Sequence, residues 1–237
     1  MHCEIMTSAL RQKLKKIYFL RSSYHLYRAW QDRLQWGPES ATLTWLDELY
    51  QSPDPWKYTS SQEEADRFES ASRLLDSVQP RIQFEHGFEV GCAEGVFTCM
   101  LANRCKSLLA VDISEVALGR ARQRCAASHV EFGQWNLLRS AVPPGMDLVV
   151  IMDVLELFFR PAEIKDARDK LVSALRPGGY LLLGNSRQSP IFETSWWGRW
   201  MLRGGKQISD LFARHPRLEL VSSECGTIYI NSLFRAK

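Results

Sequence analysis

The sequence predicts an α/β protein built on a doubly wound, mostly parallel sheet of seven strands. Short apolar segments alternate with helical stretches over most of the chain. The apolar segments span 84–90, 107–112, 130–133, 147–152 and 180–184, and the helical stretches lie near 61–78, 95–104, 114–126 and 161–175. This alternation is typical of parallel strands joined by right-handed crossover helices. The last two strands, 218–224 and 227–234, are separated only by Cys225-Gly226, which predicts a C-terminal antiparallel hairpin.

The helices carry their own start and stop signals. The 61–78 helix is rich in acidic residues in its first turn, where negative charge stabilises the helix dipole. The 161–175 helix has Pro161 in its first turn and apolar residues at helical spacing along one face. Arg176-Pro177-Gly178-Gly179 then predicts its end, so we expect the next strand to begin at Tyr180.

Composition and charge bound the class of protein. The 237 residues are 45% hydrophobic and 24% charged, which excludes a disordered or fibrous chain. A net charge of +3 is too weakly basic for a nucleic-acid clamp. The six cysteines include no CxxC pair and no histidines share metal-ligand spacing, so we expect reduced thiols and no metal site. No apolar run approaches the ~20 residues that span a bilayer, and we expect a cytoplasmic protein.

We expect a helical extension at 1–51 that is distinct from the rest of the chain. Residues 1–36 contain seven basic and two acidic residues, a net charge of +5. The stretch 10–35 is amphipathic, so a contact with a membrane surface or a partner is one interpretation. A cap helix with a solvated basic face is the simpler interpretation, and we favour it. The prolines of Ser52-Pro53-Asp54-Pro55-Trp56 prevent a continuous helix there, which predicts a second domain at 52–237.

The first strand-to-helix turn has the features of a ligand site. It reads Glu89-Val90-Gly91-Cys92-Ala93-Glu94-Gly95, with an acid ending the strand and Gly95 opening the helix. Gly91 permits a tight turn, and the free N–H groups of the helix N-terminus point at a ligand. Asp112 ends the second strand 21 residues after Gly91. At this spacing a carboxylate can accept hydrogen bonds from both ribose hydroxyls.

The same turn argues against a dinucleotide. Ala93 stands where the dinucleotide fingerprint requires glycine. Glu89 and Glu94 would repel a pyrophosphate, at about 4 kcal/mol per charge pair. S-adenosylmethionine has no phosphate, and carboxylates favour its ammonium and sulfonium charges. The pattern from Glu89 to Asp112 resembles the glycine-rich site of class I S-adenosylmethionine-dependent methyltransferases, and the resemblance runs from about residue 52 to the end. It implies their Rossmann-like methyltransferase fold for 52–237.

Further motifs extend this resemblance. Asn136 stands where relatives end the third strand with an Asp that accepts from the adenine amino group, and its amide oxygen can also accept. The resemblance implies that the backbone N–H of Leu137 serves the adenine ring. It also places Cys92, Ile113 and Met152 at the cofactor, with Cys92 as a packing residue rather than a nucleophile.

A narrower resemblance lies upstream and near the end of the chain. Asp54-Pro55-Trp56-Lys57-Tyr58 with Arg67, and the segment Gly205–Phe212, are similar to the nodulation protein S family, whose namesake N-methylates a chitooligosaccharide. The resemblance implies that Trp56 and Tyr58 wall the cofactor pocket. It also implies that Arg67 pairs with the methionine carboxylate of the cofactor.

The ionisable candidates for catalysis are Asp153 and Glu156, which follow the fourth strand. The alternative is that Asp153 only hydrogen-bonds backbone and that Glu156 is an exposed helix residue. An amine acceptor needs only deprotonation and orientation, whereas a hydroxyl requires a stronger base. Because Leu157 stands where many relatives carry His or Tyr, the sequence favours N-methylation over O-methylation.

The predicted function is methyl transfer from S-adenosylmethionine to an amine or hydroxyl of a small molecule. A saccharide is the acceptor that the family resemblance suggests, and a nucleic acid is not expected. The rival hypothesis is a methyltransferase-like binding or scaffold module that works through its basic N-terminal helix.

Overall fold

The computed structural model describes residues 46–79, 83–158, 161–187 and 204–237. Residues Ser52–Lys237 form one compact unit. Of the residues before Ser52, the structure describes only 46–51, of which 46–49 are helical. The expected basic helix at 10–35 therefore lies outside the described residues. In the described part of the chain, no helix has both the length and the apolar character needed to cross a membrane.

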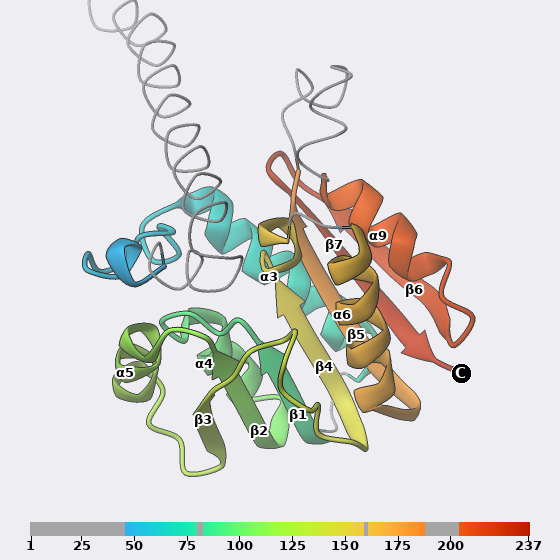
Figure 1. Ribbon diagram of the computed structural model, residues 1–237, viewed down its shortest axis with the longest axis horizontal. Helices are drawn as coiled ribbons and strands as arrows, with labels where there is room; N and C mark the ends of the chain where they lie inside the picture. Colours follow the sequence, from blue (N-terminus) through green and yellow to red (C-terminus); the bar gives the residue numbers. More distant parts are fainter. Residues whose placement is uncertain (1–45, 80–82, 159–160, 188–203) are drawn as a thin grey trace, which may run out of the picture. The chain divides into compact units, whose positions relative to one another are not determined.

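Seven strands form a single sheet in the order β3-β2-β1-β4-β5-β7-β6 (Figure 1). They are β1 (Phe84–Val90), β2 (Cys105–Asp112), β3 (Val130–Gln134), β4 (Met146–Met152), β5 (Leu175–Ser186), β6 (Leu218–Cys225) and β7 (Tyr229–Ala236). Strands β1 to β5 are parallel, whereas β7 runs antiparallel to both β5 and β6. The predicted sheet and its C-terminal hairpin are therefore confirmed.

Strand β5 begins earlier than the sequence predicts. Leu175 already pairs with Met146, and regular pairing resumes between Tyr180 and Leu148 after an irregularity. The proline and glycines between them belong to this irregular stretch of the strand and do not form a separate loop. Gly179 is required there because a Cβ would lie 2.8 Å from the carbonyl oxygen of Met146.

Helices cover both faces of the sheet. They are α3 (Gln62–Val78), α4 (Val96–Ala102), α5 (Glu115–Arg124), the 3-10 helix η1 (Leu155–Leu157), α6 (Pro161–Ala174) and α9 (Gly205–Ala213). Helices α6 and α9 pack on one face, whereas α3 and α4 pack on the other (Figure 1). Alternate residues of β4 serve the two layers: Val149 and Ile151 face α6 and α9, and Leu148 and Val150 face α3 and α4.

The parallel register brings the ends of four strands to one edge of the sheet. Strands β1, β2, β3 and β4 are neighbours and run in the same direction. The turn after β1, the acid that ends β2, the loop after β3 and the residues after β4 therefore lie along that edge. In open α/β sheets this is the edge at which ligands bind.

Candidate active site

The turn between β1 and α4 has the backbone that its glycines predict. Gly91 and Gly95 both have φ of +78°, in the left-handed region that favours glycine. A Cβ on Gly91 would lie 2.2 Å from Val154 Cγ2, and one on Gly95 would lie 3.0 Å from the Cα of Ala121. The backbone N–H of Gly91 donates to the carbonyl of Val111 at 2.8 Å, which ties the turn to β2. Both glycines are therefore required for this close packing.

A small pocket opens beside this turn and collects six of the predicted cofactor residues. Its lining residues are Tyr58, Arg67, Phe68, Glu89, Val90, Gly91, Cys92, Phe97 and Met152. They come from the 52–61 segment, α3, β1 and the turn that follows it, α4 and β4. The predicted residues among them are Tyr58, Arg67, Glu89, Gly91, Cys92 and Met152.

Arg67 is a fully buried cation on α3, with only 1% of its surface exposed. Its Nη1 forms an ion pair with Asp153, and its Nη2 lies 2.9 Å from a carboxylate oxygen of Glu64. The guanidinium also lies over the rings of Tyr58 and Phe68, at 5.4 and 5.2 Å from their centroids. Within the described residues, its Nε and Nη2 have no hydrogen-bond partner. The edge formed by Nε and Nη2 has the fork geometry that suits a carboxylate, and the ion pair with Glu64 already lies at its Nη2 end.

Glu89 is a buried acid at the end of β1. Burial raises its pKa to about 7, against the opposing effect of a hydrogen bond from Thr98 Oγ1 at 2.6 Å. The nearby carboxylate of Asp112 raises the pKa further. A buried acid in a ligand pocket is stabilised in its charged form when a cation binds beside it.

Asp112 connects the ends of β1 and β2. Its two carboxylate oxygens accept the backbone N–H groups of Ala93 and Ser114, each at 2.9 Å. Burial raises its pKa, whereas these backbone hydrogen bonds lower it. Each oxygen retains a second lone pair for a ligand hydroxyl. The carbonyl of Ile113, the next residue, accepts from the side chain of Gln134 at 3.0 Å.

The loop after β3 holds the two residues assigned to adenine. The side-chain oxygen of Asn136 accepts from the backbone N–H of Leu138 at 2.9 Å, so it is already used once within the loop. Leu137 is buried, and its carbonyl accepts from Lys170 Nζ at 3.1 Å. The backbone N–H of Trp135 donates to the carbonyl of Asp112 at 2.9 Å. This contact places the loop beside the end of β2.

The two candidate catalytic acids have different surroundings. One Asp153 oxygen is paired with Arg67, and the other accepts from Ser186 Oγ at 3.0 Å. Asp153 also has φ of +53°, a strained backbone conformation for a residue other than glycine. The alternative in which it binds only backbone is therefore wrong.

Glu156 is half-buried on η1, not an exposed helix residue. Its Oε1 accepts the backbone N–H of Ser186 at 2.8 Å, whereas its buried Oε2 has no hydrogen-bond partner among the described residues. Burial raises the pKa of Glu156 to about 7, and hydrogen bonds to backbone and the charge of Arg67 oppose this effect. The sequence did not single out Ser186, which contacts both acids.

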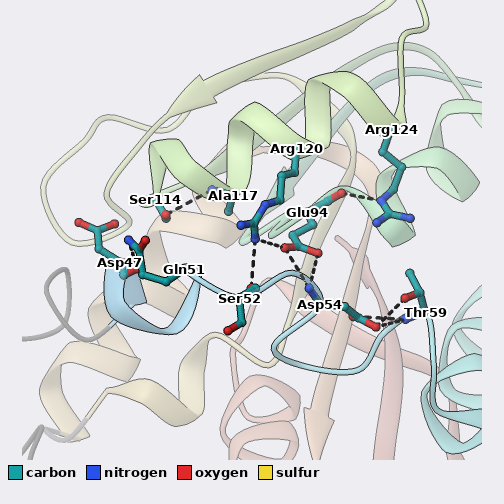
Figure 2. A network of polar contacts seen from close by, with 10 residues as sticks. All are labelled: Asp47, Gln51, Ser52, Asp54, Thr59, Glu94, Ser114, Ala117, Arg120 and Arg124. Atoms are coloured by element: carbon teal, nitrogen blue, oxygen red, sulfur yellow. Dashed lines mark hydrogen bonds and ion pairs between the residues drawn. The ribbon is translucent and has the colours of Figure 1, made fainter.

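The position of Glu94 corrects the electrostatic argument from the sequence. Its buried carboxylate is held by Arg120 of α5 and by the backbone N–H of Asp54 at 3.0 Å (Figure 2). Arg120 also donates to the carbonyl of Ser52 at 3.2 Å. The negative charge of Glu94 is therefore neutralised within the protein, and Glu94 instead anchors the 52–61 segment to the glycine turn. Trp56, which belongs to the same 52–61 segment, is half-buried and is not among the residues that line the pocket.

Contacts from distant elements fix α3 and with it Arg67. Asn231 of β7 donates to the carbonyl of Arg67 at 2.9 Å, and the hydroxyl of Tyr229 donates to the carbonyl of Asp66 at 3.3 Å. Sequence reasoning missed these residues because no local pattern marks them. It also missed Glu64, although its position three residues before Arg67 allows contact on one helix face.

The seven-stranded sheet with its reversed β7, the glycine turn and the acid ending β2 define a class I S-adenosylmethionine-dependent methyltransferase. Within this class, the chain belongs to the nodulation protein S (NodS) family, which residues 42–222 match. Nodulation protein S of Sinorhizobium fredii (strain NBRC 101917 / NGR234) is 34% identical over 157 residues, which are 63% of this chain and 71% of the relative.

Two further comparisons agree. Nodulation protein S of Bradyrhizobium diazoefficiens (strain USDA 110) is 33% identical over 135 residues, covering 56% of this chain and 63% of that protein, which is less than two thirds of its length. The crystal structure of the N-methyltransferase NodS from Bradyrhizobium japonicum WM9, in complex with S-adenosyl-L-homocysteine, superposes with a TM-score of 0.72. The two sequences are 28% identical, and the matched region covers 82% of this chain and 98% of the NodS chain. None of these relatives supports the scaffold hypothesis.

Proposed function

We propose that this protein transfers a methyl group from S-adenosylmethionine to an amine of a small-molecule acceptor, with an amino-bearing saccharide as the favoured class. The observation that carries the choice of an amine is the free, buried Oε2 of Glu156 on an acid whose pKa is raised to about 7. Methylation of a hydroxyl is the second candidate.

The pocket chemistry supports the cofactor assignment. The Arg67 guanidinium suits the methionine carboxylate, which would share it with the paired Glu64 and Asp153, and Glu89 suits the ammonium. Asp112 would accept from the ribose hydroxyls, and Asn136 with Leu137 would serve the adenine. When bound, the cofactor supplies an activated methyl carbon for in-line displacement. The remaining predicted contacts are Tyr58, Gly91, Cys92, Gly95, Ile113 and Met152.

The surroundings of the two acids support a division of roles. Both oxygens of Asp153 are engaged, one by Arg67 and one by Ser186. We therefore assign Asp153 to holding Arg67 and Glu156 to proton transfer. A base with a pKa near the working pH is well matched to an ammonium acceptor, whereas an aliphatic hydroxyl holds its proton far more tightly. The acceptor ammonium would lose one proton to Glu156, and the resulting neutral amine would attack the methyl carbon as the bond from that carbon to the sulfonium sulfur breaks.

All of these residues lie within 52–237, which supports the assignment of that segment as the methyltransferase domain. Most of the helical extension that the sequence predicts at 1–51 lies outside the described residues. The family resemblance supports a saccharide acceptor, and no feature of the pocket favours a nucleic acid.

The first test is calorimetric titration with S-adenosylmethionine and S-adenosylhomocysteine, with NAD as the control. We expect both sulfur compounds to bind and NAD not to bind. The acceptor is then tested with a matched pair: a chitooligosaccharide with one free amino group and its fully N-acetylated counterpart. Methylation of the first alone supports the proposal. Equal methylation of both would favour the hydroxyl, and methylation of neither would overturn the saccharide class.

A further inference from the structure

We propose that Lys170 of α6 is a positioning residue that orients Asn136 toward the base of the nucleoside, an inference that rests on the proposed function. The Lys170 ammonium donates to the carbonyls of Leu137, Leu138 and Ser140, at 3.1, 2.7 and 3.3 Å. Its three N–H donors are thus matched by three carbonyl oxygens of one loop. This clamp ties the loop after β3 to a helix in the core of the domain.

One peptide group links this clamp to the side chain of Asn136. The carbonyl of Leu137 and the N–H of Leu138 belong to the same planar peptide unit and point in opposite directions. Lys170 holds the carbonyl end at 3.1 Å, and the Asn136 side-chain oxygen accepts the N–H end at 2.9 Å. Fixing one end of this unit therefore fixes the direction of the Asn136 carboxamide.

The rest of the loop supports the same orientation. The carbonyl of Asn136 accepts from the backbone N–H of Ser140 at 2.8 Å, and the Ser140 hydroxyl accepts from the backbone N–H of Asn136 at 3.2 Å. Because the loop also contacts the backbone of Asp112, it lies where the base of a ribose-bound nucleoside must project. Without Lys170, three carbonyls in a partly buried loop would lose their donor, and the loop would rearrange to reach water.

The test compares two ligands that differ only at the base: S-adenosylhomocysteine, with a 6-amino group, and S-inosylhomocysteine, with a 6-oxo group. Lys170→Met removes the clamp, and Lys165→Met is the matched control, because Lys165 is an exposed lysine on the same helix. We expect Lys170→Met to weaken binding of the adenosyl ligand at least about tenfold. The preference of the protein for the adenosyl over the inosyl ligand should fall in parallel. Lys165→Met should change neither the affinity for the adenosyl ligand nor this preference.

Equal weakening of both ligands would overturn the inference, because it would mean a general loss of structure. Unchanged binding in Lys170→Met would also overturn it while leaving the proposed function intact. A wild-type protein that binds neither ligand would overturn both. If Lys170→Met does not fold, Lys170→Gln keeps two N–H donors on a shorter side chain and serves the same comparison, with a smaller loss of preference expected.

Discussion

Replacing Glu89 with Gln should make the protein more stable at alkaline pH while weakening its binding of the cofactor. Glu89 is 4% exposed, and burial raises its pKa from 4.5 to about 7. Gln retains an oxygen that accepts from Thr98, so the shape and the main hydrogen bond of the site are kept. The substitution therefore removes the charge and little else.

The magnitude follows from proton linkage. The unfolded chain releases this proton near pH 4.5, whereas the folded protein retains it up to about pH 7. The folded state thus binds more protons within this window and loses stability as the pH rises through it. A pKa difference of about 2.5 corresponds to about 3 kcal/mol of folding free energy. The protein loses this amount in full above about pH 7 and loses none of it below about pH 4. Glu89→Gln should recover about this amount at pH 8.5 and almost none at pH 4.5.

Urea unfolding followed by tryptophan fluorescence at several pH values measures this difference. Glu85→Gln is the matched control, because Glu85 lies on the same strand but is 58% exposed and pairs with Lys106. Its effect on stability should be small and independent of pH above about 5. A Glu89→Gln advantage that does not grow between pH 5 and pH 8.5 would refute the reasoning.

The same variant should bind S-adenosylmethionine less tightly. A charged hydrogen bond to an ammonium is worth about 1.5–3 kcal/mol, which is about a 10- to 150-fold loss of affinity. Stability and affinity should therefore move in opposite directions at pH 8.5. If both fall together, Glu89 is a structural residue and not a ligand of the ammonium.

Three other substitutions give separate checks. Glu156→Gln should lower kcat about 10²- to 10⁴-fold and abolish a rise in rate through about pH 7, measured in a pH–rate profile; a retained rise would exclude Glu156 as the base. Asp112→Ala should weaken cofactor binding by about 1–3 kcal/mol in calorimetry, and unchanged affinity would remove it from the ribose site. Glu94→Gln should lower the free energy of unfolding by about 1–3 kcal/mol, because a buried acceptor of Arg120 and Asp54 is replaced by an amide, and unchanged urea unfolding would contradict this.

The fold was predictable because its signals are local and repeated. The near-continuous apolar run of β4 marks a strand buried on both faces, and the turn after β1 needs its glycines for positive φ and close packing. Strand β5 was only partly predicted. Proline and glycine stop a helix, but they also occur in strands at irregular positions, so the local sequence does not distinguish the two.

The partners of the charged residues were not predictable in the same way. Glu94 lies in the turn between Gly91 and Gly95, and this position suggested that its charge faces the ligand. Arg120 neutralises it from 26 residues away, and this depends on how α5 packs against the turn. The contact of Ser186 with Asp153 likewise spans 33 residues and depends on the pairing of β4 with β5. Such contacts follow from the tertiary structure and leave no periodic signal in the sequence.

The charge balance of the pocket explains why these partners matter for function. Arg67 is the one cation among the described residues that line the pocket, and Asp153 and Glu64 already lie against its guanidinium. Glu89 is the acid in the lining itself, and because Asp153 and Glu64 already balance the charge of Arg67, carboxylates outnumber cations in and around the pocket, which favours a cationic ligand. S-adenosylmethionine carries one more positive charge than S-adenosylhomocysteine. Loss of that charge on methyl transfer would weaken the attraction to the pocket, so the same carboxylates that favour binding of the methyl donor favour release of the product.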